Sequence, residues 1–417
     1  MTSCSAQIDD LVKILEISRH LVLNQDLQAL IRQIEQAAVT VLNCERATVF
    51  MYDENADELF SLLLDRPEKI RIPSNCGIAG ICFRQGVIVN VPDAYQDPRF
   101  NRLIDRATGF RTRAILAAPL FGDQQKVLGV LEVLNKQFGT FEKGDEFLLE
   151  VLSAQCGVAI HRQTLIEEFA ERKRLQQELA IARDIQKSLL PASAPAIPGY
   201  DIAGWSQSAE ETGGDFFDFH VKSSANLLMI LADVSGHGVG SALLAAECSA
   251  LHRAIFLLIE DYRLSLSHLN SMLCRNIPGD RFITAFAGYL NARTHEFSFL
   301  SAGHGPVFLL RNQQGRIDTL PVASVPLGIM PNAGYDDWQA LSLNPGDTLV
   351  ALTDGFFEWE DSSGHCYGPE RVCQSILRHA GLPAARMIEN IHRDLLNFIK
   401  GTRQQDDLTA VVIKKLP

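Results

Sequence analysis

Apolar residues in the first part of the chain follow two spacings, one helical and one typical of strands. Helical spacing over residues 7–43 predicts two amphipathic helices, with Asp26 as the N-cap of the second. A short helix is expected between Gly77 and Gly86, and the polar segment 92–112 is expected to be a functional loop. Strands are predicted at residues 46–52, 58–64, 87–91, 114–121 and 127–134.

Residues 147–190 continue the helical pattern without a proline and with acidic and basic side chains in similar number. A coiled coil that joins two protomers is the favoured interpretation, and a long helix packed on its own domain is the alternative. Pro191 marks the end of this helix. The apolar stripe consists of Leu165, Phe169, Leu175, Leu179, Ala182, Ile185 and Leu189.

After residue 200, strands and helices alternate in a way that suggests two packed sheets flanked by helices. Residues 265–276 and 383–399 are the clearest helices. We therefore expect an α+β protein in three parts. These are a first domain at 1–163, a helical linker at 164–192 and a second domain at 193–417.

Composition limits the partners and the compartment. The 417 residues are 47% hydrophobic and 21% charged, and the net charge of −12 argues against a nucleic-acid partner. Nine cysteines without a Cys-x-x-Cys pair are typical of reduced thiols in a cytoplasmic protein. The N-terminus has no secretion signal, and no apolar run approaches the roughly 20 residues that span a bilayer. The expectation is a cytoplasmic protein with no membrane partner.

The stretch 231–240, Leu-Ala-Asp-Val-Ser-Gly-His-Gly-Val-Gly, carries the strongest candidate chemistry. An apolar strand at 227–232 brings Asp233 to a glycine-rich turn, and a small-residue helix follows at 241–250. A carboxylate beside bare backbone suits a hard cation that takes oxygen ligands. Taken alone, Asp233 equally well caps a helix or braces the turn.

Three further acidic motifs occur at predicted strand ends. They are Gly213-Gly214-Asp215-Phe216-Phe217-Asp218, Leu352-Thr353-Asp354-Gly355 and Gln405-Asp406-Asp407-Leu408-Thr409. In this order the four motifs resemble the metal-dependent serine/threonine protein phosphatases of the SpoIIE-like branch, over residues 175–417. The segment 178–191, with Ile185-Gln186, is similar to the helix that precedes this branch and carries its regulation. The resemblance implies a largely antiparallel α-β-β-α sandwich.

The same resemblance implies a site for two Mn²⁺ or Mg²⁺ ions that activate water for direct hydrolysis. Asp233 would bridge the ions, with the backbone carbonyl of Val234 as a further ligand. Asp354 and Asp406 would complete the shell of one ion, and Asp215 would support the other through water. Supporting or structural roles are expected for Asp218, Asp407, His237 and His304.

The N-terminal half, about residues 8–163, resembles the GAF sensory domains that bind cyclic nucleotides. Their signature is matched by Asn135, Lys136, Phe141, Asp145 and Glu146. By this resemblance, cAMP or cGMP would contact the backbone of Ile78 and Ala79 and the side chains of Asp105, Thr108 and Thr112, with Glu132 at the purine edge. As a structural alternative, the threonines form turns and Glu132 is an ordinary strand carboxylate.

The sequence thus predicts a homodimeric protein phosphatase under cyclic-nucleotide control. Its substrate would be a protein phosphorylated on serine or threonine, and the family suggests an anti-sigma-factor antagonist. One alternative is a nucleotide cyclase, because residues 213–216 resemble the Gly-Gly-Asp-Glu-Phe loop of diguanylate cyclases, although Phe216 replaces the carboxylate. The other is a cyclic-nucleotide-sensing interaction protein with an inactive phosphatase domain, against which the retained Asp215, Asp233, Asp354 and Asp406 argue.

Overall fold

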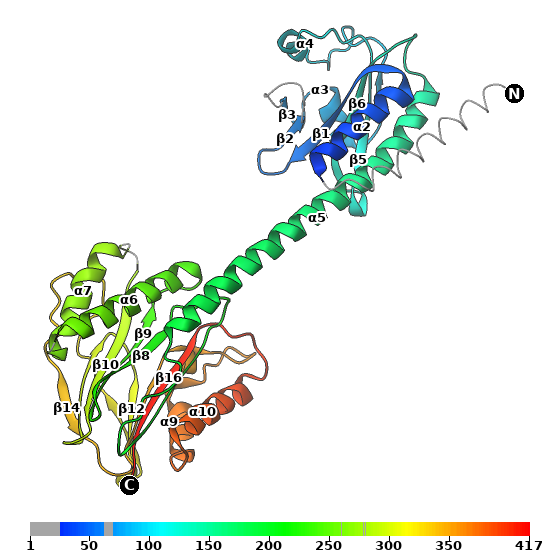
Figure 1. The fold of residues 1–417 in the computed structure, drawn as a ribbon. Coiled ribbons are helices and arrows are strands. Elements are labelled where there is room, and N and C mark those ends of the chain that lie inside the picture. Colours follow the sequence, from blue (N-terminus) through cyan, green and yellow to red (C-terminus); the bar gives the residue numbers. More distant parts are fainter. Residues whose placement is uncertain (1–25, 62–69, 260, 278, 280) are drawn as a thin grey trace. The chain divides into compact units, whose positions relative to one another are not determined.

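The computed structural model describes residues 26–61, 70–259, 261–277, 279 and 281–417, without the side chains of residues 107 and 108. The chain divides into two compact units, residues 1–174 and 175–417 (Figure 1). The first predicted helix, before Asp26, and the end of the strand predicted at 58–64 lie outside the described residues.

The first unit is built on a six-stranded antiparallel sheet in the order β3-β2-β1-β6-β5-β4. Its strands are β1 (Cys44–Asp53), β2 (Glu58–Ser61), β3 (Arg71–Pro73), β4 (Val89–Val91), β5 (Ile115–Phe121) and β6 (Val127–Lys136). Its helices are α2 (Leu27–Leu42), α3 (Gly77–Gln85), α4 (Arg102–Thr108) and the first part of α5 (Lys143–Leu189).

Each face of this sheet has its own apolar core. On one face, α2 and the start of α5 bury Leu30, Ile34 and Leu152 against the strands. A side chain on Gly157 of α5 would lie 2.3 Å from the carbonyl oxygen of Phe121, so only glycine lets α5 pack this closely on β5. On the other face, α3 forms a smaller core beside the loop that leads to β5.

Two local predictions of the sequence can be compared directly with this unit. Asp26 caps α2 by accepting a hydrogen bond from the amide of Gln28 at 3.1 Å, as predicted. The segment 92–112 is not entirely loop, because it contains α4. Asn101 caps that helix at its N-terminus, and Gly109 ends it in the left-handed conformation, which are signals that the loop prediction overlooked.

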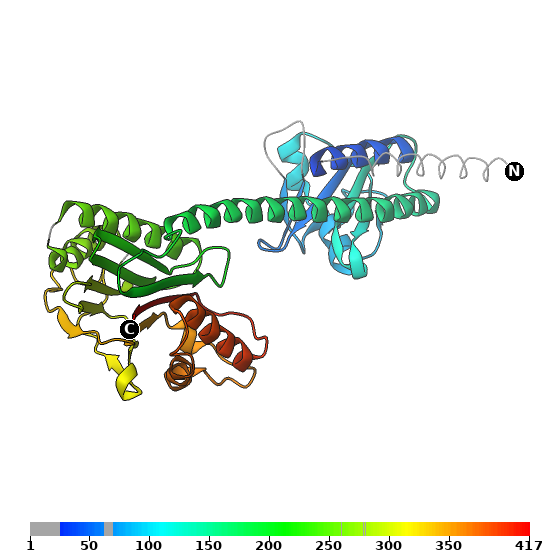
Figure 2. The ribbon, with the colours of Figure 1, turned by 60° about the horizontal axis from the view of Figure 1, so that its bottom comes forward.

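The second unit is a four-layered sandwich of two five-stranded antiparallel sheets between helices (Figure 2). One sheet has the order β14-β11-β10-β9-β8, and the other has the order β13-β12-β15-β16-β7. The α-β-β-α prediction is therefore confirmed. The strands are β7 (Tyr200–Gln207), β8 (Phe216–Ser223), β9 (Asn226–Val234), β10 (Ile283–Asn291), β11 (Glu296–Ala302), β12 (Val307–Arg311), β13 (Arg316–Leu320), β14 (Gln339–Ser342), β15 (Thr348–Leu352) and β16 (Leu408–Lys415). The helices are α6 (Val239–Leu258), α7 (Ser265–Asn276), α8 (Gly355–Glu358), α9 (Gly368–Arg378) and α10 (Ala384–Ile399).

Three cores hold these layers together. The first lies between the sheets and includes Phe217, Phe286 and Phe297. The second packs α6 and α7 on one sheet, and the third packs α9 and α10 on the other. Because the central strands β9 and β15 bury both of their faces, they are apolar runs with little alternation, as in Leu227–Ala232.

Helix α6 corrects one expectation. By length and composition it is the one helix in the described part of the chain that is apolar enough to cross a membrane, whereas the sequence analysis expected no such stretch. Half of that stretch is buried inside the second unit, where α6 packs on β8 and β9. Every cysteine that the structure describes is a free thiol.

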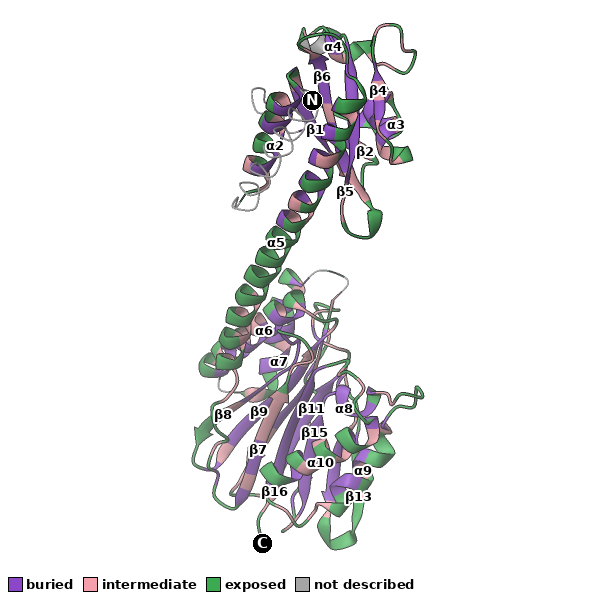
Figure 3. Cartoon of the chain, turned by 90° about the vertical axis from the view of Figure 1, so that its right-hand side faces the viewer, coloured by how far each residue is buried: buried purple, intermediate pink, exposed green. Residues whose placement is uncertain are grey.

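Helix α5 leaves apolar side chains in solvent along its later part (Figure 3). Leu165, Phe169, Leu175 and Ile185 from the predicted stripe are each 51–69% exposed. Single exposed apolar residues are common, but a row at helical spacing is characteristic of a surface that a partner covers.

Candidate active site and ligand pocket

The acidic residues predicted from the sequence lie at one end of the sandwich. Asp233 is the second-to-last residue of β9. Asp215 directly precedes β8, and the first residue of β8 pairs with Ala232 of β9. Asp354 follows β15, and Asp406 precedes β16, which pairs with β15. The hydroxyl of Thr353 donates to Oδ2 of Asp215 at 2.7 Å and so joins the ends of the two sheets.

The electrostatics of this acidic cluster are unfavourable without a cation. Burial, followed by repulsion from Asp354 and Asp406, raises the pKa of Asp233 to about 7. Burial, followed by Asp406, raises the pKa of Asp354 to about 6. Burial, followed by Asp233 and Asp407, raises the pKa of Asp215 well above its usual range. All the charged neighbours that shift these three groups most are carboxylates, so a bound cation would relieve the repulsion.

The donor set fits hard divalent cations. Asp215, Asp233, Asp354 and Asp406 offer only oxygen atoms, the ligands that Mg²⁺ and Mn²⁺ prefer over thiolate or imidazole. The carbonyl of Val234 is close to the Asp215 loop, because a side chain on Gly214 would lie 2.9 Å from that oxygen. The glycine motif therefore lets the loop before β8 close onto the end of β9.

Two residues hold the Asp215 loop from elsewhere in the chain. The Asp407 carboxylate accepts hydrogen bonds from the amides of Gly214 at 2.6 Å and Ala209 at 2.8 Å. Gln186, near the end of α5, accepts from the amide of Gly213 at 3.0 Å and donates to the carbonyl of the same residue. The sequence motif that contains Gln186 predicts a regulatory helix but not the contact between Gln186 and the acidic loop.

The remaining polar residues of these motifs have other partners. Asp218 forms an ion pair with Arg253, with a distance of 2.5 Å between Oδ2 and Nε. His304 is buried, its pKa is lowered to about 4 by that burial, and its ring bridges the Thr284 hydroxyl and the Leu352 carbonyl, each at 3.1 Å. His237 is largely exposed, with its side chain 83% accessible.

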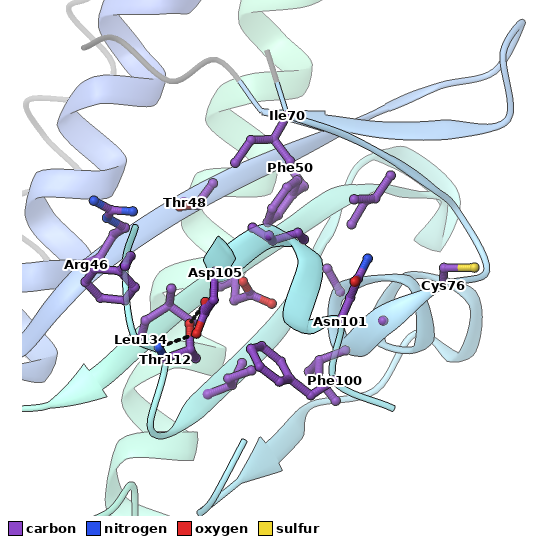
Figure 4. A pocket seen from close by; sticks show the side chains of 18 residues that line it. Arg46, Thr48, Phe50, Ile70, Cys76, Phe100, Asn101, Asp105, Thr112 and Leu134 are labelled. Atoms are coloured by element: carbon purple, nitrogen blue, oxygen red, sulfur yellow. Dashed lines mark hydrogen bonds between the residues drawn. The ribbon is translucent and has the colours of Figure 1, made fainter. Parts of the chain in front are cut away.

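The first unit contains a pocket between its sheet and the segment around α4 (Figure 4). It encloses about 740 Å³ of empty space, part of which is open to solvent. Five of the six residues predicted to contact a nucleotide line it, namely Ile78, Ala79, Asp105, Thr112 and Glu132. The side chain of Thr108 lies outside the described residues.

The polar groups of the pocket differ in their surroundings. Asp105 is buried and accepts from the hydroxyl of Thr112 at 2.7 Å and from its amide at 2.8 Å. Tyr95 donates to the same carboxylate at 3.1 Å. Glu132 has no hydrogen-bond partner among the described residues, and burial raises its pKa to about 7.

Other residues of the pocket were not predicted. Arg46 lies on the pocket wall with its guanidinium carbon 4.3 Å from the centre of the Phe110 ring. Thr48 and Asn101 add polar atoms, and Phe50 adds an aromatic wall. Strand alternation places residues 46, 48 and 50 on one face of β1, and this period of two was the signal available in the sequence.

The signature residues of the first unit brace the pocket without lining it. The Asn135 side chain accepts from the amide of Arg113 at 2.6 Å and donates to the carbonyl of Arg111 at 2.9 Å, on both sides of Thr112. Lys136 forms an ion pair with Asp145. The motif therefore fixes the segment that carries Thr112.

Comparisons with known proteins agree with this division of the chain. Residues 26–160 match the family model described as GAF domain, and residues 223–416 match the one described as Stage II sporulation protein E. The SiaA-PP2C domain of Pseudomonas aeruginosa has a similar fold, with a TM-score of 0.52 and 22% identity over 59% of this chain and 98% of that chain.

Curated relatives cover different shares of the chain. Phosphoserine phosphatase RsbU of Bacillus subtilis is 27% identical over 274 residues, which are 65% of this chain and 78% of that protein. Protein IcfG of Synechocystis is 26% identical over 60% of this chain and 43% of that protein. The dual 3',5'-cyclic-AMP and -GMP phosphodiesterase 11 of Drosophila melanogaster is 31% identical over 43% of this chain, but only 14% of that protein is covered. The chain therefore carries a GAF domain, followed by a domain that matches the Stage II sporulation protein E model and has a fold similar to the SiaA-PP2C domain.

Proposed function

We propose that this protein is a metal-dependent phosphatase that removes phosphate from phosphoserine or phosphothreonine of a regulatory protein, under the control of a cyclic nucleotide bound by its GAF domain. The observation that carries the catalytic part is the acidic cluster. Four segments far apart in the sequence bring carboxylates together. Three of them, Asp215, Asp233 and Asp354, have raised pKa values and no cationic group among their main electrostatic neighbours. Such a cluster is costly to fold unless it holds cations.

Each residue of the cluster has a proposed role. Asp233, Asp354 and Asp406, with the carbonyl of Val234, would hold Mn²⁺ or Mg²⁺ directly, and Asp215 would hold a second ion through water. When bound, the ions neutralise the cluster and supply an activated water for hydrolysis of the phosphoester. Thr353 holds the Asp215 side chain through its hydroxyl, and Asp407 holds the loop before it through the amide of Gly214.

The protein substrate is proposed from the relatives. RsbU is named as a phosphoserine phosphatase, and the SpoIIE-like branch suggests an anti-sigma-factor antagonist as the phosphoprotein. The carboxylate-rich site would repel an anionic phosphoester unless bound ions offset the negative charge of the carboxylates. Turnover should therefore depend steeply on the metal concentration.

The regulatory part rests on the GAF pocket. Five predicted nucleotide contacts meet in it, and apolar side chains line the rest of its wall. The amides at the start of α3 suit a cyclic phosphate, and Glu132 suits the polar edge of a purine. The similarity to a phosphodiesterase named for cyclic AMP and cyclic GMP supports this ligand class without selecting between the two.

A homodimer through α5 completes the proposal. The exposed apolar stripe offers a surface for a second copy of the same helix. Near the end of α5, Gln186 binds the backbone of Gly213 in the acidic loop. A change in how the two helices pack would therefore reach the loop that carries Asp215 through the hydrogen bonds between Gln186 and Gly213.

Hydrolysis of p-nitrophenyl phosphate by the full-length protein tests the proposal. Turnover should require Mn²⁺ or Mg²⁺, cease with excess chelator, and change when cAMP or cGMP is added. Turnover that persists in chelator contradicts the metal-dependent site. Nucleotide binding without any turnover on aryl phosphates or phosphoproteins favours the interaction protein with an inactive phosphatase domain.

A further inference from the structure

Arg281 has a place in the second unit that the acidic motifs do not explain. It directly precedes Phe282, which exchanges hydrogen bonds with Ser235: the amide of Phe282 donates to the Ser235 hydroxyl, and the amide of Ser235 donates to the Phe282 carbonyl, both at 2.9 Å. Two residues after Phe282, Thr284 of β10 pairs with Asp233 of β9. Arg281 therefore leaves the sheet at the same end as Asp233.

The guanidinium of Arg281 lies against the first turn of α6. A side chain on Gly240 would be 3.0 Å from both terminal nitrogens of Arg281, so the glycine leaves room for a flat guanidinium. Nη1 of Arg281 is buried and has no hydrogen-bond partner among the described residues. A buried, unsatisfied N–H group of an arginine is costly, and such groups in native proteins call for an explanation.

The N-terminus of α6 makes the burial of the Arg281 guanidinium more unfavourable. α6 has 20 residues, its N-cap is Gly238, and no side chain caps it. The amides of Val239, Gly240 and Ser241 have no acceptor among the described residues. The N-terminus of a helix carries partial positive charge, which repels a guanidinium. An anion bound beside the guanidinium and the uncapped amides would stabilise both.

The proposed reaction supplies that anion. A phosphomonoester carries up to two negative charges, and the acidic cluster offers it only carboxylates and the ions they hold. Arginine presents a planar fork that matches two phosphate oxygens, which a lysine cannot do. The loop 235–240 that follows Asp233 and Val234 is short, and Arg281 lies over its far end.

We propose that Arg281 binds the phosphoryl group of the substrate, and the phosphate product, together with the first-turn amides of α6. This inference rests on the proposed phosphatase function and names a binding residue for it. Arg281 anchors the anion from the side opposite the carboxylates, so that the ester bond faces the water that the ions activate. It holds no metal, and its loss leaves the metal ligands intact.

Arg281→Met and Arg281→Lys test the role, with Arg293→Met as the matched control. Arg293 is exposed just beyond the other end of β10, which places its charge in the same domain but away from Asp233. Three quantities are measured on full-length protein with Mn²⁺: KM and kcat on a phosphorylated peptide, inhibition by orthophosphate, and Mn²⁺ affinity by calorimetry.

Arg281→Met should raise KM and the orthophosphate inhibition constant about 10- to 100-fold, the range for losing charge-assisted hydrogen bonds. Mn²⁺ affinity should stay within twofold of wild type. Arg281→Lys should recover part of the loss, because it restores the charge without the fork. Arg293→Met should match wild type in all three measurements.

Several outcomes would overturn the inference. An unchanged orthophosphate inhibition constant in Arg281→Met excludes a phosphate contact. Equal loss of Mn²⁺ affinity and thermal stability in both Arg281 variants would mean that the residue only supports α6. Thermal stabilisation of the Mn²⁺-loaded protein by orthophosphate provides a readout that needs no turnover. If that stabilisation depends on Arg281 while the wild type hydrolyses nothing, the proposed function fails and the anion site stands.

Discussion

The two sites satisfy their carboxylates in different ways. In the GAF pocket, Asp105 accepts hydrogen bonds from Thr112 and Tyr95, so the chain itself stabilises the charge. In the acidic cluster, the main charged neighbours of Asp233 are Asp354 and Asp406, and those of Asp354 are Asp406 and Glu358. Asp105 is therefore stabilised before a ligand arrives, whereas the carboxylates of the cluster repel one another until cations bind. Ligand removal should affect the two units very differently.

The sites also differ in how the chain assembles them. The pocket is lined by residues 46–134, from one sheet, the helices α3 and α4 and the adjoining loops. The cluster joins segments far apart, and the hydrogen bond between Gly214 and Asp407 spans 193 positions. A site built from distant strand ends depends on the packing of both sheets. A regulatory element needs to move only one of those ends, and Gln186 of α5 is bonded to such an end.

The largest effect is expected from removing a charged ligand of the cluster. Asp233→Asn or Asp354→Asn should lower Mn²⁺-dependent turnover at least about 1000-fold, because direct metal ligands are lost. The metal-free variant should be at least as stable as wild type, since one repelling charge is gone. Turnover of p-nitrophenyl phosphate and chemical denaturation in chelator measure the two effects.

His237→Ala is the control for this experiment. The ring is exposed at the glycine turn beside Asp233, and its Nδ1 lies 3.7 Å from Glu210, so most activity should remain. Near-wild-type turnover in Asp233→Asn would contradict the two-metal site. Complete loss in His237→Ala would assign that histidine a catalytic role.

The sequence was most informative where a pattern has a local cause. β15 and α7 have the predicted bounds, because an apolar run and a helical period fix them locally. α6 extends beyond its predicted end at residue 250, since its later apolar residues pack on the sheet and only tertiary contact shows this. The residues of the cluster were found through spaced motifs. No local sequence pattern reveals the distant contacts made by Gln186, Asp407 and Arg281.

The second effect concerns the GAF pocket. Asp105→Ala combined with Thr112→Ala removes a mutually bonded pair that closes one side of the pocket. Nucleotide binding should weaken at least about tenfold, and the rise in melting temperature with excess cAMP or cGMP should disappear. Calorimetry on full-length protein measures the binding. Wild-type protein that binds neither nucleotide would leave the GAF domain as a dimerisation module or a sensor of another ligand.

The third effect concerns α5. Four residues inserted after Arg174 should turn the downstream part of the helix by about 40° relative to the upstream part, since one turn takes about 3.6 residues. Seven residues keep the apolar stripe on nearly the same face. The four-residue variant should show one fixed activity with or without nucleotide, and the seven-residue variant should keep a several-fold response. Equal responses in both variants would mean that the helix is only a spacer.

The smallest expected effect is a pH dependence of the unfolding free energy that arises from Glu132 in the GAF pocket. Burial raises the pKa of Glu132 from 4.5 to about 7, so the folded protein holds a proton that the unfolded chain releases in this window. The unfolding free energy should therefore fall as the pH rises from about 4.5 to about 7, and then level off. For this carboxyl the loss should be about 1–3 kcal/mol.

Glu132→Gln cannot ionise, so its first unit should be more stable than wild type at pH 8 and nearly equal at pH 5, in chemical denaturation with chelator present. Glu35→Gln is the matched control, because burial also raises the pKa of Glu35 to about 7, yet Glu35 does not line the pocket and accepts from the amide of Val49 at 3.0 Å. Both variants should flatten the pH profile, but only Glu132→Gln should change nucleotide affinity, since only Glu132 faces the ligand. A nucleotide affinity unchanged by Glu132→Gln would make Glu132 a buried carboxyl of the sheet with no part in recognition.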